Sequence, residues 1–283
     1  MTVRFFSFDQ ANIKSKPVED SYYHVGFGGT HAFAVGDGIS RTCYGIEGIP
    51  SSLPAAEAFC RVSATALVGG KSLRESFMRA NAEIALVNKR AGITSRTMDY
   101  LERDYICCVG IAGVITEDHP HIFRYGYMGD CGVLAYQQCG RPVFLSDNPV
   151  AALERFRDEW GCENKTQETL LWRQHFRNHP GRLCGASFGA LTGEEFAMRY
   201  LMTGKIRCVL GEVIMLFSDG IYPFLFDRRF RAMVSDLLQD DETTDASKQT
   251  VVANYITGAM HKLQQKGVAN LNDDKTFMAL TMT

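Results

Sequence analysis

The sequence lacks any long uninterrupted apolar stretch. No segment of the 283 residues approaches the roughly 18 consecutive apolar residues that a membrane-spanning helix needs. Residues 1–9 have neither a basic start nor a long apolar run, so no export signal is expected there. These absences predict a soluble, cytoplasmic protein with no membrane partner.

The sequence also lacks an excess of positive charge. It has 30 Lys and Arg residues against 32 Asp and Glu residues, which gives a formal net charge of −2 at pH 7. Proteins that bind nucleic acid through its phosphate backbone usually carry a basic excess. Nucleic acid is therefore not an expected partner.

Cysteine pairs of the C-x-x-C type are missing as well. The nine cysteines are scattered, and most of them stand among apolar neighbours. Because zinc sites and dithiol redox sites usually need closely spaced pairs, we expect these cysteines to be reduced and mostly buried.

The sequence does contain the material for a large core, since 46% of its residues are hydrophobic and 11% aromatic. Short β-branched and aromatic runs predict strands at 3–8, 22–27, 31–35, 105–115, 121–128, 133–136, 143–145, 213–217 and 276–282. Apolar spacing and capping residues predict helices at 53–68, 73–90, 149–160, 167–178, 192–203, 226–239 and 246–265.

The order of these elements indicates the class of fold. Strands and helices do not alternate strictly, which favours an α+β fold of antiparallel sheets with helices outside. Neither a linker nor an internal repeat divides the chain. Residues 1–283 are therefore expected to form a single domain, with an irregular helical segment near 149–185.

Aspartates beside glycines follow several of the predicted strands. They are Asp37, Asp130 and Asp219, and further acidic pairs stand at Glu19-Asp20 and Asp273-Asp274. One Asp-Gly pair alone is first of all a turn signal, but carboxylates at strand ends of one sandwich can converge. Several aspartates cannot stay ionised together without cations, and an all-oxygen donor set favours Mg²⁺ or Mn²⁺. Two such ions suit hydrolysis of a phosphoester.

At these residues the sequence resembles the metal-dependent protein phosphatases, the PPM or type 2C serine/threonine phosphatase family, as a divergent member. Six motifs follow in the family's order: Glu19-Asp20, Asp37-Gly38, Gly129-Asp130, Leu191-Thr192-Gly193, Ser218-Asp219-Gly220 and Asp273-Asp274-Lys275-Thr276. The resemblance runs from about residue 15 to the C-terminus. It implies two central antiparallel sheets packed as a sandwich with helices on both outer faces, in agreement with the predicted element order.

The resemblance also implies a role for each acidic residue. Two central Mn or Mg ions would be held by Asp37, the Gly38 carbonyl, Asp20, Asp219 and Asp273. Glu19 would hold a metal-bound water, and Asp130 together with Asp219 would serve a third, weaker ion. Asp37, Asp219 and Glu19 are thus the candidate catalytic residues.

The sequence departs from the family at the place where substrate phosphate is bound. The usual arginine position holds Ser15, so the flanking Lys14 and Lys16 are the candidate phosphate-binding residues, although a lysine lacks the bidentate fork of arginine. Ile39 stands where the family has a histidine, and Cys131 stands where it has a serine.

Taken together, the residues and the resemblance predict a Mn/Mg-dependent signalling hydrolase. It would remove phosphate from phosphoserine or phosphothreonine in a phosphoprotein through a hydroxide that bridges the two metals. Two alternatives stay open: a weak or inactive member of the fold that binds a signalling partner, and a phosphatase of small phosphate esters. The sequence indicates no oligomeric state.

Overall fold

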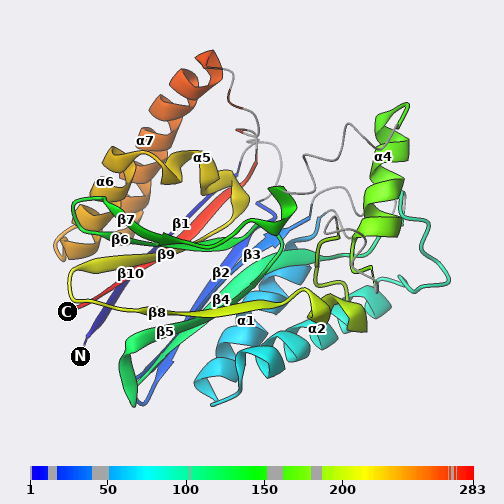
Figure 1. Ribbon diagram of the computed structural model, residues 1–283, viewed down its shortest axis with the longest axis horizontal. Helices are drawn as coiled ribbons and strands as arrows, with labels where there is room; N and C mark the ends of the chain where they lie inside the picture. The colour runs from blue at the N-terminus through cyan, green and yellow to red at the C-terminus, as the bar shows by residue number, and fades with distance from the viewer. Residues whose placement is uncertain are drawn as a thin grey trace.

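The computed structural model describes residues 2–11, 18–39, 51–101, 103–151, 162–179, 187–266, 268, 271 and 273–283. Within these ranges the chain forms two five-stranded antiparallel sheets (Figure 1). The first sheet has the strand order β1 (Val3–Gln10), β10 (Lys275–Met282), β9 (Glu212–Phe217), β6 (Gly132–Gln137), β7 (Pro142–Leu145). The second has the order β2 (Ser21–Phe27), β3 (Thr30–Gly38), β4 (Cys108–Thr116), β5 (His119–Met128), β8 (Met202–Arg207).

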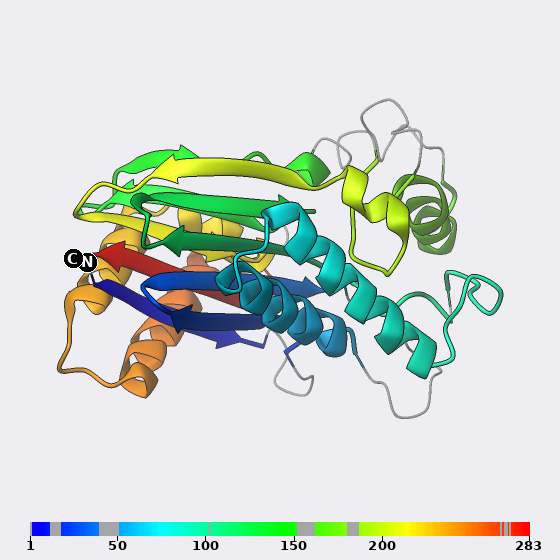
Figure 2. The ribbon, with the colours of Figure 1, turned by 90° about the horizontal axis from the view of Figure 1, so that it is seen from below.

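Helices cover both outer faces of this sandwich (Figures 1 and 2). The helices α1 (Leu53–Val68) and α2 (Leu73–Arg90) lie outside the second sheet, where α1 packs on β2, β3 and β4. Outside the first sheet, α6 (Arg228–Gln239) and α7 (Asp245–Gln265) pack on β1, and the short α5 (Tyr222–Leu225) precedes them. The α+β sandwich predicted from the sequence is confirmed.

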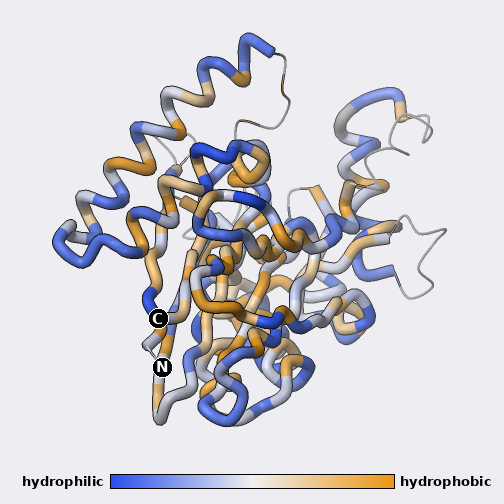
Figure 3. The backbone as a smooth tube through the Cα atoms, turned by 60° about the vertical axis from the view of Figure 1, so that its left-hand side comes forward, coloured by the Kyte–Doolittle hydropathy of each residue, from blue (hydrophilic) through white to orange (hydrophobic). Residues whose placement is uncertain are grey.

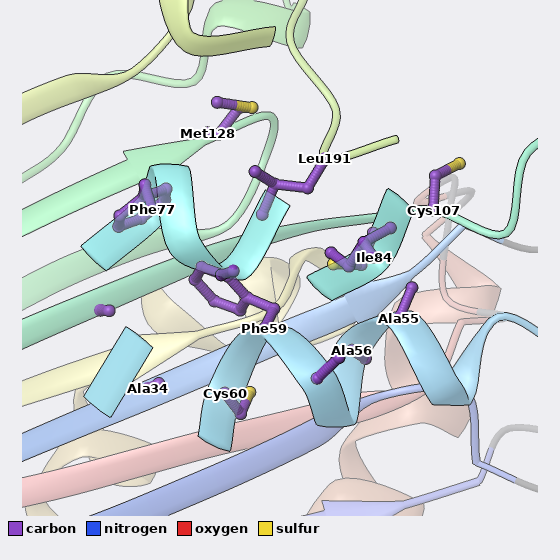
Figure 4. Packing of buried hydrophobic residues seen from close by; sticks show 14 of the residues in the cluster. Ala34, Ala55, Ala56, Phe59, Cys60, Phe77, Ile84, Cys107, Met128 and Leu191 are labelled. Atoms are coloured by element: carbon purple, nitrogen blue, oxygen red, sulfur yellow. The ribbon is translucent and has the colours of Figure 1, made fainter. Parts of the chain in front are cut away.

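The fold has four layers: helices, two sheets and helices. Three clusters of buried apolar side chains hold these layers together. Between the sheets, inward-facing side chains such as Phe33, Ile111 and Leu216 are fully buried. Outside the second sheet, Phe59 of α1 packs edge-on against Phe77 of α2, with ring centroids 5.1 Å apart (Figure 4). Figure 3 shows that hydrophobic residues are concentrated in the central strands.

Local sequence signals explain where the helices begin. Helix α2 starts with a capping box: the Ser72 hydroxyl accepts a hydrogen bond from the Glu75 amide, and the Glu75 carboxylate accepts one from the Ser72 amide. Helix α7 starts in a similar way, because the Thr244 side chain accepts a hydrogen bond from the Ser247 amide. None of the helices in the described ranges is long and apolar enough to cross a bilayer.

The helix predicted at 192–203 is wrong. This segment holds only a short 3-10 helix, Glu195–Arg199, followed by strand β8. The Thr192 hydroxyl, expected to cap a helix, instead hydrogen-bonds the Glu194 carboxylate at 2.8 Å. The predicted helix at 167–178 differs in form, because α4 (Lys165–Leu171) continues as a π-helical turn, Trp172–Phe176. Most of the predicted helix at 149–160 lies outside the described residues.

Two histidines form a hydrogen-bonded pair on β2 and β3. Nε2 of His24 and Nδ1 of His31 lie 3.2 Å apart, a contact that requires one of the two nitrogens to be unprotonated. The rings of Phe5 and Phe33 pack on His24 with centroid distances of 4.1 and 4.7 Å. Burial, together with the charge that His31 can carry, lowers the pKa of His24 to about 4, and burial lowers the pKa of His31.

This pair predicts a loss of stability in acid. Since both pKa values lie below the unfolded value near 6.5, the unfolded chain binds more protons between about pH 6.5 and pH 4. The stabilisation by the neutral pair is therefore complete above pH 6.5 and disappears as the pH falls toward 4. Because His24 is only half-buried, we expect His24→Gln to remove about 1 kcal/mol of this pH dependence, measured by urea unfolding. The exposed His261→Gln is the matched control, and identical pH profiles for wild type and His24→Gln would contradict the prediction.

Candidate functional site

The candidate site lies at one end of the sandwich, where several strand ends meet. In the second sheet Ser21 pairs with Gly36, Cys108 with Gly38, and Met128 with Gly110. In the first sheet Phe217 pairs with both Phe277 and Gly132. The acidic residues beside these strand ends are consequently brought to one edge: Glu19, Asp20, Asp37, Asp130, Asp219 and Asp273.

Hydrogen bonds tie the acidic segments of the two sheets to each other. The Ser218 hydroxyl donates to Oδ2 of Asp20 at 2.7 Å, and the Glu19 amide donates to Oδ2 of Asp274 at 2.7 Å. Oε1 of Glu19 accepts a bond of 2.9 Å from the Ser52 amide, at the start of α1. Each acidic segment is therefore fixed by a partner that is distant in the sequence.

Two glycines of the Asp-Gly pairs allow this close approach. Neither Gly38 nor Gly220 has a positive φ, so neither serves as a left-handed turn residue. A Cβ at Gly38 would lie 2.5 Å from the Glu19 carbonyl oxygen, and a Cβ at Gly220 would overlap the Asp274 carbonyl oxygen. The glycines are required because the backbones of different acidic segments touch at these points.

The carboxylates of the site repel one another. Burial, assisted by the charges of Asp273 and Asp274, raises the pKa of Asp20 to about 7. Burial and neighbouring carboxylates also raise the pKa values of Asp37 and Asp219 well above their usual range. Burial also raises the pKa of Asp273. Four buried carboxyl groups with raised pKa values need protons or cations to be stable together.

Asp37 and Asp219 form the centre of this cluster. Their side chains are within hydrogen-bond reach of each other, and Oδ1 of Asp219 is buried with no hydrogen-bond partner among the described residues. An unpaired buried carboxylate oxygen is costly unless a cation or a proton satisfies it. Both residues stay partly exposed, which leaves the centre reachable from solvent.

The chemistry of the donor set fits a hard divalent cation. The carboxylates around Asp37 and Asp219 offer oxygen ligands, which suit Mg²⁺ or Mn²⁺. Burial and the nearby carboxylates raise the pKa of the Cys131 thiol, so Cys131 stays a neutral thiol rather than a soft thiolate ligand. In the described part of the chain, however, no three His, Cys, Asp or Glu side chains form a complete metal-binding cluster. The residues fit by type and electrostatics without forming a finished coordination shell.

The remaining predicted residues have mixed positions. Asp130 is half-buried in the turn after β5, and its charge acts on both Asp37 and Asp219. Glu19 is half-buried between the Ser52 amide and the segment of Asp274. The predicted phosphate-binding residues Lys14 and Lys16 lie outside the described residues.

Lys275 is a residue of this site that the sequence reasoning missed. Its side chain is buried, and Nζ donates to the carbonyl oxygens of Asp273 at 2.6 Å and Leu271 at 3.1 Å. Burial lowers the pKa of Lys275, while the nearby carboxylates act in the opposite direction. The ammonium group thus braces the loop that carries Asp273. A charged residue at the start of a mostly apolar strand, directly after two aspartates, was the available signal.

A buried ion cluster anchors the segment beside the site. Asp104 is fully buried and pairs with two arginines: Arg177 through two hydrogen bonds and Arg173 through Nε at 3.1 Å. Burial alone would lower the pKa of Arg177, but Asp104 raises it above the usual value. Cys108, which pairs with Gly38, also exchanges backbone hydrogen bonds with Leu191. The segment after α4 is thereby tied to the strand next to Asp37.

Comparison with solved structures identifies this arrangement, although neither a family model nor a curated protein matches the sequence. The serine/threonine phosphatase of S. agalactiae superposes with a TM-score of 0.59 at 11% identity, over 100% of both chains. The chain has the fold of the PPM-type serine/threonine phosphatases. Within this fold, the catalytic domain of PstP in complex with two manganese ions matches with a TM-score of 0.57 at 14% identity, over 99% of this chain and 97% of that one.

A third structure with the PPM-type fold is RsbX in complex with magnesium. It matches with a TM-score of 0.53 at 10% identity, over 99% of this chain and 96% of that one. Two of the three structures therefore contain Mn or Mg ions, which supports divalent metals within this fold. The resemblance inferred from the acidic motifs is confirmed at the level of the fold.

Proposed function

We propose that this chain is a divergent member of the PPM family, a single domain over residues 1–283 that hydrolyses phosphoserine or phosphothreonine in a protein substrate. The observation that carries the proposal is the pair Asp37 and Asp219: two adjacent carboxyl groups with raised pKa values, one of them with an unpaired buried oxygen. Such a pair stores electrostatic repulsion that a divalent cation relieves.

The residues that would hold two central ions are Asp20, Asp37, the Gly38 carbonyl, Asp219 and Asp273, with Asp130 serving a third and weaker ion. Bound Mn²⁺ or Mg²⁺ would supply an activated water and neutralise the phosphate charge. Glu19 would orient water, because its carboxylate is held against Ser52 at the rim of the cluster. Lys275 would keep Asp273 in place through its backbone carbonyl.

Lys14 and Lys16 are proposed to bind the substrate phosphate as point charges. Lysine offers charge without the bidentate geometry of the family's arginine, so phosphate is expected to be held less rigidly. A substrate whose phosphate is held less rigidly needs further contacts. This expectation therefore favours a protein substrate that also binds elsewhere on the surface of the phosphatase.

The deciding experiment compares hydrolysis of p-nitrophenyl phosphate and of a phosphothreonine peptide, with Mn²⁺ or with a chelator. We expect turnover of both substrates with Mn²⁺, and a loss of at least about 100-fold with the chelator or in Asp37→Asn. Asp118→Asn, an exposed turn aspartate, is the matched control and should keep full activity. Activity that survives chelation and Asp37→Asn would refute the proposed centre.

The same experiment separates the two alternatives. Activity on the aryl phosphate but none on the phosphopeptide would indicate a phosphatase of small esters. No activity on either substrate, with bound Mn²⁺ detected by calorimetry, would favour a signalling module that binds a partner. The incomplete ligand geometry of the described residues is the observation that keeps this last alternative in the test.

A further inference from the structure

A basic patch lies on the second sheet, far from the acidic site. It consists of Arg124 on β5 and of Lys205 and Arg207 on β8, all of them exposed. Arg124 pairs with Lys205, and Ile122 pairs with Arg207, so these four residues point to one face of the sheet. Arg124 also pairs with Val114 on β4, and Val114 packs in the core beneath α1 and α2. The patch therefore lies on the same face of the sheet as these two helices.

Helices leave this part of the face open. In Figure 2, the cyan helices α1 and α2 lie over part of the sheet, while the arrowhead end of the yellow strand β8 extends beyond them. A pocket of about 380 Å³ opens there, lined by His121, Ile122, Lys205 and Arg207. Two basic side chains, Lys205 and Arg207, therefore line this pocket together with the half-buried apolar residue Ile122.

The basic patch forms no ion pair with a carboxylate in the described part of the chain. In a chain with a net charge of −2, three unneutralised cations on adjacent strands of one sheet are a concentrated positive surface. Its electrostatic complement is an anionic ligand.

A simpler role explains only part of the patch. Lysines on edge strands discourage pairing between sheets of different molecules, and β8 is an edge strand. This accounts for Lys205 but not for Arg124, which lies on the inner strand β5, nor for the pocket.

We propose that the basic patch is a docking site for an acidic peptide segment of a partner protein. Lys205 and Arg207 are two residues apart on one strand, which places them about 7 Å apart, the spacing of alternate side chains in an extended peptide. Carboxylates at every second position of such a peptide can meet both cations, and Ile122, which pairs with Arg207 on the neighbouring strand, offers an apolar contact beside them. Six residue steps along β5 lead from Ile122 to Met128 at the acidic site, a distance of about 20 Å. Docking at the patch therefore leaves that site free.

An anionic membrane is a less suitable occupant. The turn between β4 and β5 lies at the same end of the sheet and carries the exposed residues Glu117 and Asp118. These two carboxylates would approach an anionic bilayer together with the patch and repel it. A peptide laid along β8 is narrower than a bilayer and lies one strand further from this turn, which joins β4 to β5.

The test measures fluorescence anisotropy of a fluorescein-labelled peptide of five Glu-Thr repeats at 50 mM NaCl. We expect saturable binding by the wild type that weakens with added salt, and an affinity at least tenfold lower for the double variant Lys205→Glu and Arg207→Glu. The matched control, Arg61→Glu with Lys89→Glu, makes the same change in net charge on α1 and α2 and should alter affinity less than twofold. Circular dichroism checks that each variant is folded.

Three results would overturn the proposal: no binding by the wild type, an equal loss in both double variants, or binding to vesicles with 30% phosphatidylserine in place of the peptide. The test is independent of hydrolysis, since Asp219→Asn should bind the peptide as the wild type does. Failure of peptide binding therefore says nothing against phosphatase activity, and an inactive enzyme can still confirm the docking site.

Discussion

Asp219→Asn is expected to stabilise the metal-free protein at pH 8 while abolishing hydrolysis. The raised pKa values of Asp20, Asp37 and Asp219 mean that the folded state binds more protons than the unfolded chain above about pH 4. The stability due to these groups is complete below about pH 4 and is lost as the pH rises through their raised folded-state pKa values, about 7 for Asp20. An asparagine carries no charge to repel its neighbours, so the metal-free variant should gain about 1 kcal/mol, or about 2–4 °C in Tm.

With bound metal, we expect the wild type to be more stable than Asp219→Asn. Mn²⁺ at one hundred times its Kd should stabilise the wild type by about 2.7 kcal/mol, because it binds only the folded state. Asp219→Asn should lose most of this response and at least about 100-fold in kcat. Calorimetry at pH 8 measures stability with and without Mn²⁺, hydrolysis of p-nitrophenyl phosphate measures kcat, and Asp118→Asn is the control for both. A variant that is less stable than wild type without metal, or that keeps the full response to Mn²⁺, would show that Asp219 has a structural role instead.

The acidic site could be predicted from the sequence because its residues are marked locally. Asp37 and Asp219 each end an apolar strand, and strand ends of one sandwich reach a common edge. The glycines after them looked like turn residues, yet Gly38 and Gly220 serve close contacts with Glu19 and Asp274. Those contacts join segments far apart in the chain, which no local pattern can show.

Strand β8 and Lys275 were missed for different physical reasons. The β8 sequence, Met202–Arg207, is polar and contains a glycine, because one of its edges is unpaired and only Ile206 is buried. Its pairing with β5 supplies the stability that its composition does not. Lys275 is charged yet buried, and only backbone carbonyls brought by the folded loop satisfy its ammonium group.

Asp104→Asn is expected to destabilise the protein by about 3–5 kcal/mol, since it removes the buried carboxylate that pairs with the guanidinium groups of Arg173 and Arg177. The comparison is Asp241→Asn, which breaks an ion pair with Arg4 whose Asp241 side chain is 69% exposed and should cost less than about 1 kcal/mol. Urea unfolding measures both losses.

A triple variant separates the loss of the ion cluster from the cost of unpaired charge. When Asp104→Leu is combined with Arg173→Met and Arg177→Met, none of the three charges of this cluster remains, and most of the lost stability should return. The arginine side chains also donate to the Tyr100 carbonyl and stack on Tyr105, so recovery is expected to stay incomplete by about 1 kcal/mol per lost hydrogen bond. If the triple variant is as unstable as Asp104→Asn, the directional hydrogen bonds of the cluster, rather than charge balance, hold the segment after α4 against the strand next to Asp37.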